Sequence, residues 1–184
     1  MTIRNQIKKI IKSIQPYDRQ ERDDLYFTSE WIDSGVEIFR ISKPANPDIH
    51  IVAYFLLIDP VSKKILLVDH KKATMWIPAG GHIEVDEHPK ETVKREIVEE
   101  LGIEANFFLE DPFFLTISKT SGTVQIHTDI ALWYLLKGGE KLKYLYDQEE
   151  FHGIKWFSLD EIPFEKAEPH LKRCISKLKL LKLI

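Results

Sequence analysis

The chain has 184 residues, of which 43% are hydrophobic and 30% are charged, which predicts one well-buried globular domain and leaves too little chain for two of ordinary size. A net charge of −3 gives no electrostatic reason to expect a nucleic-acid polymer as partner, and no apolar run approaches the ~18 residues of a membrane span. The single cysteine, Cys174, excludes an internal disulfide. Because the N-terminus also lacks a signal-peptide-like apolar core, we expect a cytoplasmic protein.

Residues 1–35 are predicted to form a helical extension ahead of the main domain, residues 36–184. Isoleucines recur at helical spacing before Pro16, which ends the first helix, and a second helix continues to about Gly35. We expect these helices to pack on the domain or against a second copy in a homodimer. Contact with a membrane surface is the less favoured alternative.

From Gly35 onward the pattern becomes that of strands. A loose alternation predicts a strand at 36–41, the apolar run Ile49–Ile58 predicts a strand covered on both faces, and Lys64–Asp69 predicts its hairpin partner. His50 is the one strongly polar residue of the apolar run. We interpret it as a hydrogen-bonded structural histidine.

A basic turn, His70-Lys71-Lys72, follows the hairpin. Cations at this place could meet a substrate phosphate, so His70 and Lys72 are candidate substrate-binding residues. A solvated basic turn without a ligand is the alternative.

A glutamate-rich helix carries the clearest chemistry of the chain. Pro89 suits the first position of a helix and Gly102 suits its terminator, so the helix is predicted between them. At about 100° per residue, Glu96, Glu99 and Glu100 fall on one face. Like charges on one face repel each other, so a cation is expected there. Oxygen ligands suit Mg²⁺ or Mn²⁺ rather than zinc.

The residues around this helix resemble the Nudix box. Gly81, Glu87 and the run Arg95–Ile103 occupy the fixed positions of that motif with no departure. The resemblance extends over about residues 48–165. It implies an α/β fold, a Nudix α/β/α sandwich with a mixed β-sheet, to which this chain adds the N-terminal helices and a C-terminal helix.

The same resemblance implies a pyrophosphohydrolase. Nudix hydrolases cleave the diphosphate linkage of a nucleoside diphosphate joined to another moiety, by attack of a metal-activated water on phosphorus. The expected partner is therefore a small-molecule nucleoside diphosphate derivative. Glu87 and Arg95 would support the metal ligands, with Arg95 holding a glutamate by a bidentate contact. The implied ligands are the Gly80 carbonyl and the carboxylates of Glu96, Glu99 and Glu100.

Three strands are predicted after the box, at Ile103–Leu109, Phe113–Lys119 and Val124–Leu136. Along the last of them Gln125, His127 and Asp129 share one face. Polar side chains on an otherwise apolar strand need contact with water or a polar partner. In a Nudix-like sheet the substrate cleft could provide it. His127 and Asp129 are therefore candidate substrate-binding residues. A solvated edge strand is the alternative.

The closing segment predicts a loop with a short strand at 137–149, a strand and turn at Gly153–Pro163, and an amphipathic helix at Lys166–Ile184. In some Nudix relatives an acidic residue a few positions before the tryptophan of this strand assists the catalytic water. Glu149 and Glu150 are both available, and the spacing favours Glu150 as the catalytic base. A solvated acidic loop is the alternative.

Two other functions stay open at this point. A catalytically silent Nudix domain that binds a nucleotide usually has a degraded box, whereas this box is intact. An isopentenyl-diphosphate-isomerase-like enzyme needs a cysteine in its cleft, whereas Cys174 falls in the terminal helix. Because the marks of two known Nudix subfamilies are missing, hydrolysis of nucleoside triphosphates and cleavage of nucleotide sugars both remain candidates.

Overall fold

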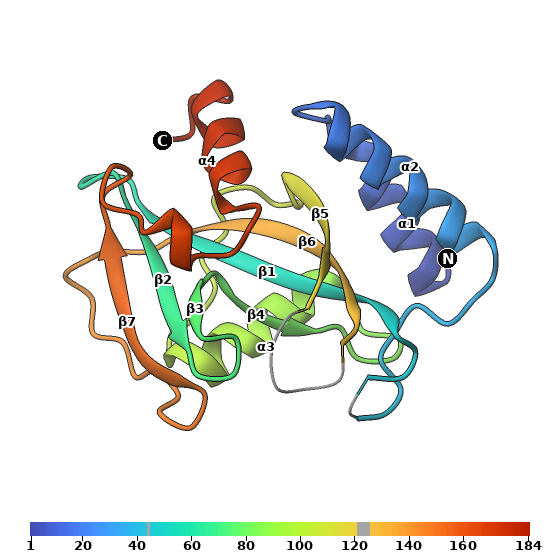
Figure 1. The fold of residues 1–184 in the computed structure, drawn as a ribbon, viewed down its shortest axis with the longest axis horizontal. Coiled ribbons are helices and arrows are strands. Elements are labelled where there is room, and N and C mark those ends of the chain that lie inside the picture. Colours follow the sequence, from blue (N-terminus) through green and yellow to red (C-terminus); the bar gives the residue numbers. More distant parts are fainter. Residues whose placement is uncertain (44, 121–125) are drawn as a thin grey trace.

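The computed structural model describes residues 1–43, 45–120 and 126–184. Its centre is a mixed sheet, which has seven strands in the described part (Figure 1). The order is β3-β2-β1-β6-β5, with β4 also paired to β1 and β7 to β2. β1 and β6 run parallel and the other pairs are antiparallel. The strands are β1 Ile49–Asp59, β2 Lys64–His70, β3 Met75–Ile77, β4 Ala79–His82, β5 Phe114–Lys119, β6 Thr128–Lys137 and β7 Phe151–Phe157.

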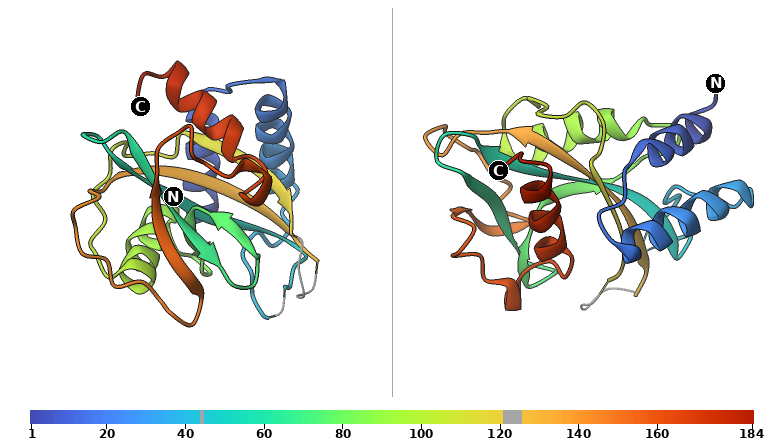
Figure 2. Two further views of the ribbon diagram at one scale, coloured as in Figure 1. Left: turned by 60° about the vertical axis from the view of Figure 1, so that its left-hand side comes forward. Right: turned by 90° about the horizontal axis from the view of Figure 1, so that it is seen from above.

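Helices cover both faces of this sheet (Figures 1 and 2). Alternate residues of β1 explain the arrangement, since Ile51 packs in one apolar cluster with Val93 of α3, and Val52 packs in the other with Leu178 of α4. The predicted α/β fold with a mixed sheet is therefore confirmed. The helices of the described residues are α1 Ile3–Ser13, α2 Arg19–Asp33, α3 Pro89–Leu101 and α4 Leu171–Leu180, with a short 3₁₀ helix at Phe164–Lys166.

The boundaries of α3 follow from its terminal residues, as predicted. Pro89 lies in its first turn, and Gly102 ends it with a φ of +66°, a conformation that glycine adopts without strain. Val93, Ile97 and Leu101 are fully buried against the sheet. The carboxylates of this helix lie on the adjoining flank, where Glu100 is buried and Glu99 is exposed.

The two leading helices pack on the sheet. Ile7 and Ile11 of α1 and Ile32 of α2 belong to the same apolar cluster as Ile51 of β1. The carboxylate of Asp18, which caps α2, accepts two hydrogen bonds from the Arg173 guanidinium on α4, at 2.7 and 2.8 Å. The division between residues 1–35 and 36–184 stays a prediction. None of the described helices is both long and apolar enough to cross a membrane.

Two predicted strands are wrong for identifiable reasons. At 36–41, the Glu37 carboxylate accepts the backbone N–H groups of Ile38 and Phe39, which withdraws those donors from a ladder. At 103–109, the N–H groups of Phe108 and Leu109 both donate to the Leu135 carbonyl, so the alternation of a strand is lost. Both segments are irregular.

Other boundaries also differ from those predicted. The last central strand, β6, begins at Thr128, and Val124 and Gln125 lie outside the described residues. The segment 137–149 contains turns and no strand after the end of β6. The closing helix is shorter than Lys166–Ile184, because Pro169 disfavours helical geometry in the residue before it, and α4 begins only at Leu171.

Candidate functional site

The glycine pair of β4 lies directly against two carboxylates of α3. A Cβ on Gly81 would come within 2.2 Å of the Glu96 carboxylate, and the Gly80 N–H donates a 2.8 Å hydrogen bond to Oε2 of Glu100. Gly80 has a φ of +140°, and a Cβ there would meet the Ala53 carbonyl oxygen at 2.2 Å, so only glycine fits. The carboxylates of Glu96 and Glu100 therefore both lie against this glycine pair.

Arg95 fixes the carboxylates beside this glycine pair. Its guanidinium donates to both oxygens of Glu87, from Nε at 3.1 Å and from Nη2 at 3.0 Å. Its Nη1 donates to Oε1 of Glu96 at 2.6 Å. The Thr92 hydroxyl also donates to Glu87, at 2.7 Å. The bidentate contact of Arg95 is thus made with Glu87, and a single contact holds Glu96.

The carboxylates differ in exposure and in electrostatic environment. Glu99 has a 60% exposed side chain, with Oε2 3.6 Å from Nη1 of Arg95, whereas Glu100 is 5% exposed. Burial raises the pKa of Glu100 well above its ordinary value, and the negative charges of Glu96 and Glu150 raise it further. Burial also raises the pKa of Glu96. A cation at this place would offset both effects.

Glu150 belongs to the same electrostatic cluster, since its charge acts on both Glu96 and Glu100. Its Oε1 lies 3.2 Å from Nε2 of His70. Nδ1 of His70 accepts the backbone N–H groups of Lys72 at 3.1 Å and of Ala73 at 3.2 Å. We therefore assign the ring proton to Nε2, directed at Glu150.

This arrangement sets the charge of Glu150. The hydrogen bond from His70 lowers the pKa of the Glu150 carboxyl, and the charge of Lys72 lowers it further. Glu150 is thereby kept ionised at neutral pH. The structure places the residues of the predicted basic turn, His70 and Lys72, around the predicted base.

The glutamate site, as we call Glu96, Glu99 and Glu100 beside Gly80 and Gly81, offers carboxylate oxygens to a cation. Such ligands suit Mg²⁺ or Mn²⁺. The crowding of the Glu96, Glu100 and Glu150 carboxylates, two of them with raised pKa values, is the environment in which a divalent cation would stabilise the ionised forms. The residues present therefore fit a hard divalent cation.

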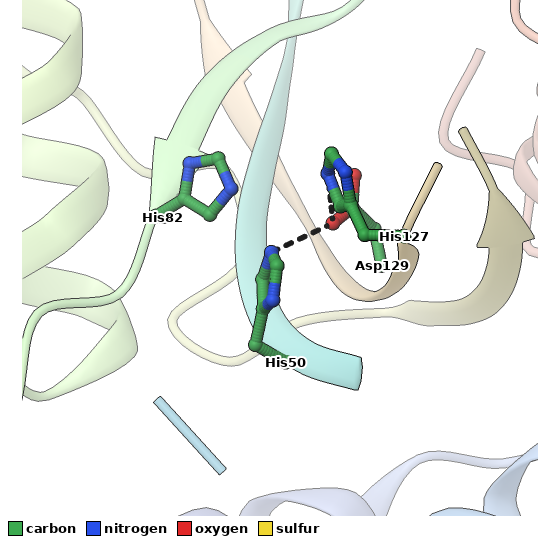
Figure 3. Close-up of side chains that lie close together, drawn as sticks. All are labelled: His50, His82, His127 and Asp129. Carbon is green, nitrogen blue, oxygen red and sulfur yellow. Dashed lines mark ion pairs between the residues drawn. The ribbon is translucent and has the colours of Figure 1, made fainter. Parts of the chain in front are cut away.

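A second polar cluster lies at the end of three neighbouring strands (Figure 3). The histidine cluster, as we call it, consists of His50 on β1, His82 on β4, His127 directly before β6, and Asp129 on β6. One ligand atom from each lies within 4.8 Å of all the others. Oδ1 of Asp129 is 3.2 Å from Nε2 of His50 and 3.3 Å from Nε2 of His127. Burial, followed by the charge of Arg40, lowers the pKa of His82 to about 3, so this imidazole is neutral.

The structure thus joins His127 and Asp129 with two histidines that sequence reasoning had not placed at a site. His50 does make a structural contact, since its Nδ1 lies 2.8 Å from the Pro47 carbonyl oxygen. Its other nitrogen nevertheless faces Asp129, because the two residues are opposite each other in the parallel β1–β6 pair. The sequence feature that could have indicated His82 as a site residue is its position directly after Gly81. Gln125, the third residue of the predicted polar face, lies outside the described residues.

The family comparison decides the class of this protein. The family model of the NUDIX domain matches residues 48–178, which is more than half of the chain. The chain belongs to the Nudix family. The predicted membership and the predicted enzyme class are confirmed, and the protein is a Nudix hydrolase of the pyrophosphohydrolase type.

Individual relatives agree with this assignment. A protein of Bacillus subtilis (strain 168) named 8-oxo-dGTP diphosphatase is 29% identical over 129 residues, covering 68% of this chain and 77% of that protein. A NUDIX-family hydrolase from Clostridium perfringens is 24% identical, with a TM-score of 0.55 over 72% of this chain and 97% of the other. A C. elegans Ap4A hydrolase is 17% identical, with a TM-score of 0.60 over the same shares, 72% and 97%. The two structures show the Nudix fold.

Proposed function

We propose that this Nudix hydrolase cleaves the diphosphate linkage of a nucleoside diphosphate derivative with Mg²⁺ or Mn²⁺ as cofactor. The observation that carries the proposal is the convergence of the Glu96 and Glu100 carboxylates on the glycine pair of β4, within the electrostatic reach of Glu150. When bound, the ion supplies positive charge that neutralises diphosphate oxygens and favours ionisation of water. Its proposed ligands are the Gly80 carbonyl and the side chains of Glu96, Glu99 and Glu100.

Glu150 is the proposed proton acceptor for the attacking water. A general base must be ionised at the working pH and held in place. The hydrogen bond from His70 meets both needs, since it lowers the pKa of Glu150 and fixes its orientation. Lys72 lies beside this pair and is the proposed contact for a substrate phosphate.

Arg95 and Glu87 act as positioning residues in this proposal. Two hydrogen bonds between them orient the guanidinium, whose remaining nitrogen holds Oε1 of Glu96. The Glu96 carboxylate therefore loses little conformational freedom when it binds an ion. Loss of Arg95 would leave three glutamates without their neighbouring cation.

Nucleoside triphosphates with an oxidised purine are the proposed substrates, because the Bacillus subtilis relative is named for activity on 8-oxo-dGTP. The test measures release of the nucleoside monophosphate, the product common to all four substrates, from 8-oxo-dGTP, dGTP, ADP-ribose and a nucleotide sugar, with Mg²⁺, with Mn²⁺ and with a chelator. We expect hydrolysis with either ion, and kcat/KM highest for 8-oxo-dGTP. A preference for a sugar derivative would contradict the proposed substrate, whereas undiminished activity in the chelator would contradict the metal dependence.

The variant Glu100→Gln tests the site itself. It should lower kcat by ~10² or more and remove the rise in melting temperature that Mg²⁺ gives to the wild type. Without metal it should melt no lower than the wild type, because a neutral amide replaces a buried acid. Glu91→Gln is the matched control, since Glu91 is exposed on the same helix and pairs only with Lys94 among the described residues. A wild-type melt that Mg²⁺ leaves unchanged would count against the site.

A further inference from the structure

We infer that the histidine cluster of His50, His82, His127 and Asp129 is a second metal site, which binds a zinc-type ion through three imidazoles and one carboxylate. The site is chemically different from the glutamate site, where all proposed ligands are oxygen atoms. Imidazole nitrogen suits Zn²⁺ and similar transition metals, whereas carboxylate and carbonyl oxygens suit Mg²⁺ and Mn²⁺. The inference does not depend on the proposed substrate.

The spacing of the ligand atoms is close to that of a tetrahedral zinc site. Bonds of about 2.0–2.2 Å place tetrahedral ligand atoms about 3.3 Å apart. Oδ1 of Asp129 already has this spacing from Nε2 of His50, at 3.2 Å, and from Nε2 of His127, at 3.3 Å. The four ligand atoms lie within 4.8 Å of one another, so side-chain shifts of roughly 1.5 Å or less would bring all four to tetrahedral spacing.

Two of the imidazoles are already oriented as metal ligands are. Metal-binding histidines usually donate their second ring N–H to a protein oxygen, which fixes the tautomer and leaves the other nitrogen for the ion. Nδ1 of His50 lies 2.8 Å from the Pro47 carbonyl oxygen, and Nδ1 of His127 lies 3.2 Å from the Thr120 hydroxyl. In both rings Nε2 is then the nitrogen directed at Asp129 (Figure 3).

The buried polar atoms of the cluster give an independent argument. Nε2 of His50, Nε2 of His82 and Oδ1 of Asp129 are buried and have no hydrogen bond of good geometry among the described residues. His50 is fully buried and Asp129 is 6% exposed. Leaving buried polar groups unsatisfied is costly. One ion bound at the centre of the cluster would satisfy all three atoms.

The position of the cluster suggests what the ion does. Four protein ligands make a closed site, which is typical of structural rather than catalytic zinc. The ion would join β4, β1 and β6, three neighbouring strands, at a point two residues from Gly80. It would therefore hold the glycine pair of β4 in place without taking part in the reaction.

The test uses the purified full-length chain, incubated with Zn²⁺ alone, freed of unbound metal by gel filtration and analysed for metal content. We expect about one zinc per chain and a higher melting temperature. Incubation with Co²⁺ should give the intense visible absorption of a tetrahedral site. His82→Asn and Asp129→Asn should each weaken zinc binding by at least ~10-fold, whereas His152→Asn, a control at an exposed histidine of β7, should bind as the wild type does.

Two outcomes would overturn the inference. One is a wild-type chain that retains no zinc and shows no tetrahedral cobalt spectrum, a measurement that needs no variant and so does not depend on whether a variant folds. The other is zinc that persists in the cluster variants but is lost in Glu100→Gln, because the ion would then occupy the glutamate site. If the Glu100→Gln variant is inactive but still binds zinc, the result supports the second site. If the wild type is fully active but binds no zinc, this inference is overturned while the proposed function stands.

Discussion

The carboxylate of Glu96 occupies the space in which a Cβ of Gly81 would lie, only 2.2 Å from that position. Gly81→Ala should therefore displace a movable side chain rather than the backbone. We expect the variant to fold, to lose most of the Mg²⁺-induced rise in melting temperature, and to lose activity by ~10-fold or more. Melting curves with and without Mg²⁺ and initial rates provide the measurement.

Gly80→Ala is the contrasting variant. Here the added Cβ would meet the backbone oxygen of Ala53 at 2.2 Å, at a φ of +140°, so β4 itself must shift. We expect a loss of stability of a few kcal/mol, measured by urea unfolding without metal. If the two alanine variants were equally stable, the clash with the Ala53 backbone would cost no more than the clash with the Glu96 side chain, which would contradict the prediction.

The contact between His70 and Glu150 predicts a change in pH dependence. Because the hydrogen bond from His70 lowers the pKa of Glu150, His70→Ala should raise that pKa. An ionised base is needed for activity, so the acid limb of kcat/KM against pH should move to higher pH in the variant. The profile is measured from pH 4 to 8 with one substrate. If the acid limb does not move, its pKa belongs to a group other than Glu150.

Glu168 predicts a loss of stability as pH rises. Burial raises its pKa to about 7 from 4.5, and the side chain is 6% exposed. The folded state then holds a proton that the unfolded state releases, so stability falls between about pH 4.5 and 7, by roughly 3 kcal/mol. Glu168→Gln should lack this fall.

The measurement is the difference in unfolding free energy between wild type and Glu168→Gln at pH 4, 6 and 8. Asp24, whose pKa burial raises to about 6, titrates in the same window but contributes equally to both proteins. A difference that stays constant with pH would contradict the prediction.

The buried ion pair of Glu21 and Lys177 predicts a large effect on stability. Nζ of Lys177 donates to Oε1 of Glu21 at 2.6 Å, and the residues are 3% and 0% exposed, respectively. Lys177→Met leaves a buried carboxylate without its cation and should cost about 3–5 kcal/mol of unfolding free energy. Glu21→Gln combined with Lys177→Met should cost much less than the sum of the single variants.

Lys179→Met is the control for this pair, because Lys179 is exposed on the same helix. It should change stability by less than about 0.5 kcal/mol. Urea unfolding of the four variants, with Glu21→Gln alone as the fourth, completes the double-mutant cycle. Additive single-variant effects would contradict the coupling.

Local signals predicted the elements that depend on local chemistry. Pro89 and Gly102 mark the ends of α3 because both act on their own backbone, and the apolar run of β1 reflects burial on both faces. The segment 36–41 was predicted incorrectly because Glu37 captures the N–H groups that a strand would use. Such competition from a neighbouring side chain is not visible in an apolar alternation.

Some features of the candidate site follow from local sequence, and others depend on tertiary packing. The shared face of Glu96, Glu99 and Glu100 follows from helical angles alone, whereas the approach of Glu96 to Gly81 needs the packing of α3 on β4. The histidine cluster needs still more, since His50 meets Asp129 only through the register of two strands far apart in sequence. Their roles in catalysis and binding stay predictions.

The parallel pairing of β1 with β6 has a consequence for synthesis. Ile49 pairs with Thr128 and Ile58 with Lys137. The pairing of β1 with β6 therefore cannot be completed until nearly three quarters of these 184 residues have been synthesised. The contacts of Asp18 and Glu21 with α4 form later still. Until β6 pairs with it, one edge of β1 leaves its backbone N–H and C=O groups unpaired, and such an edge can pair with another chain.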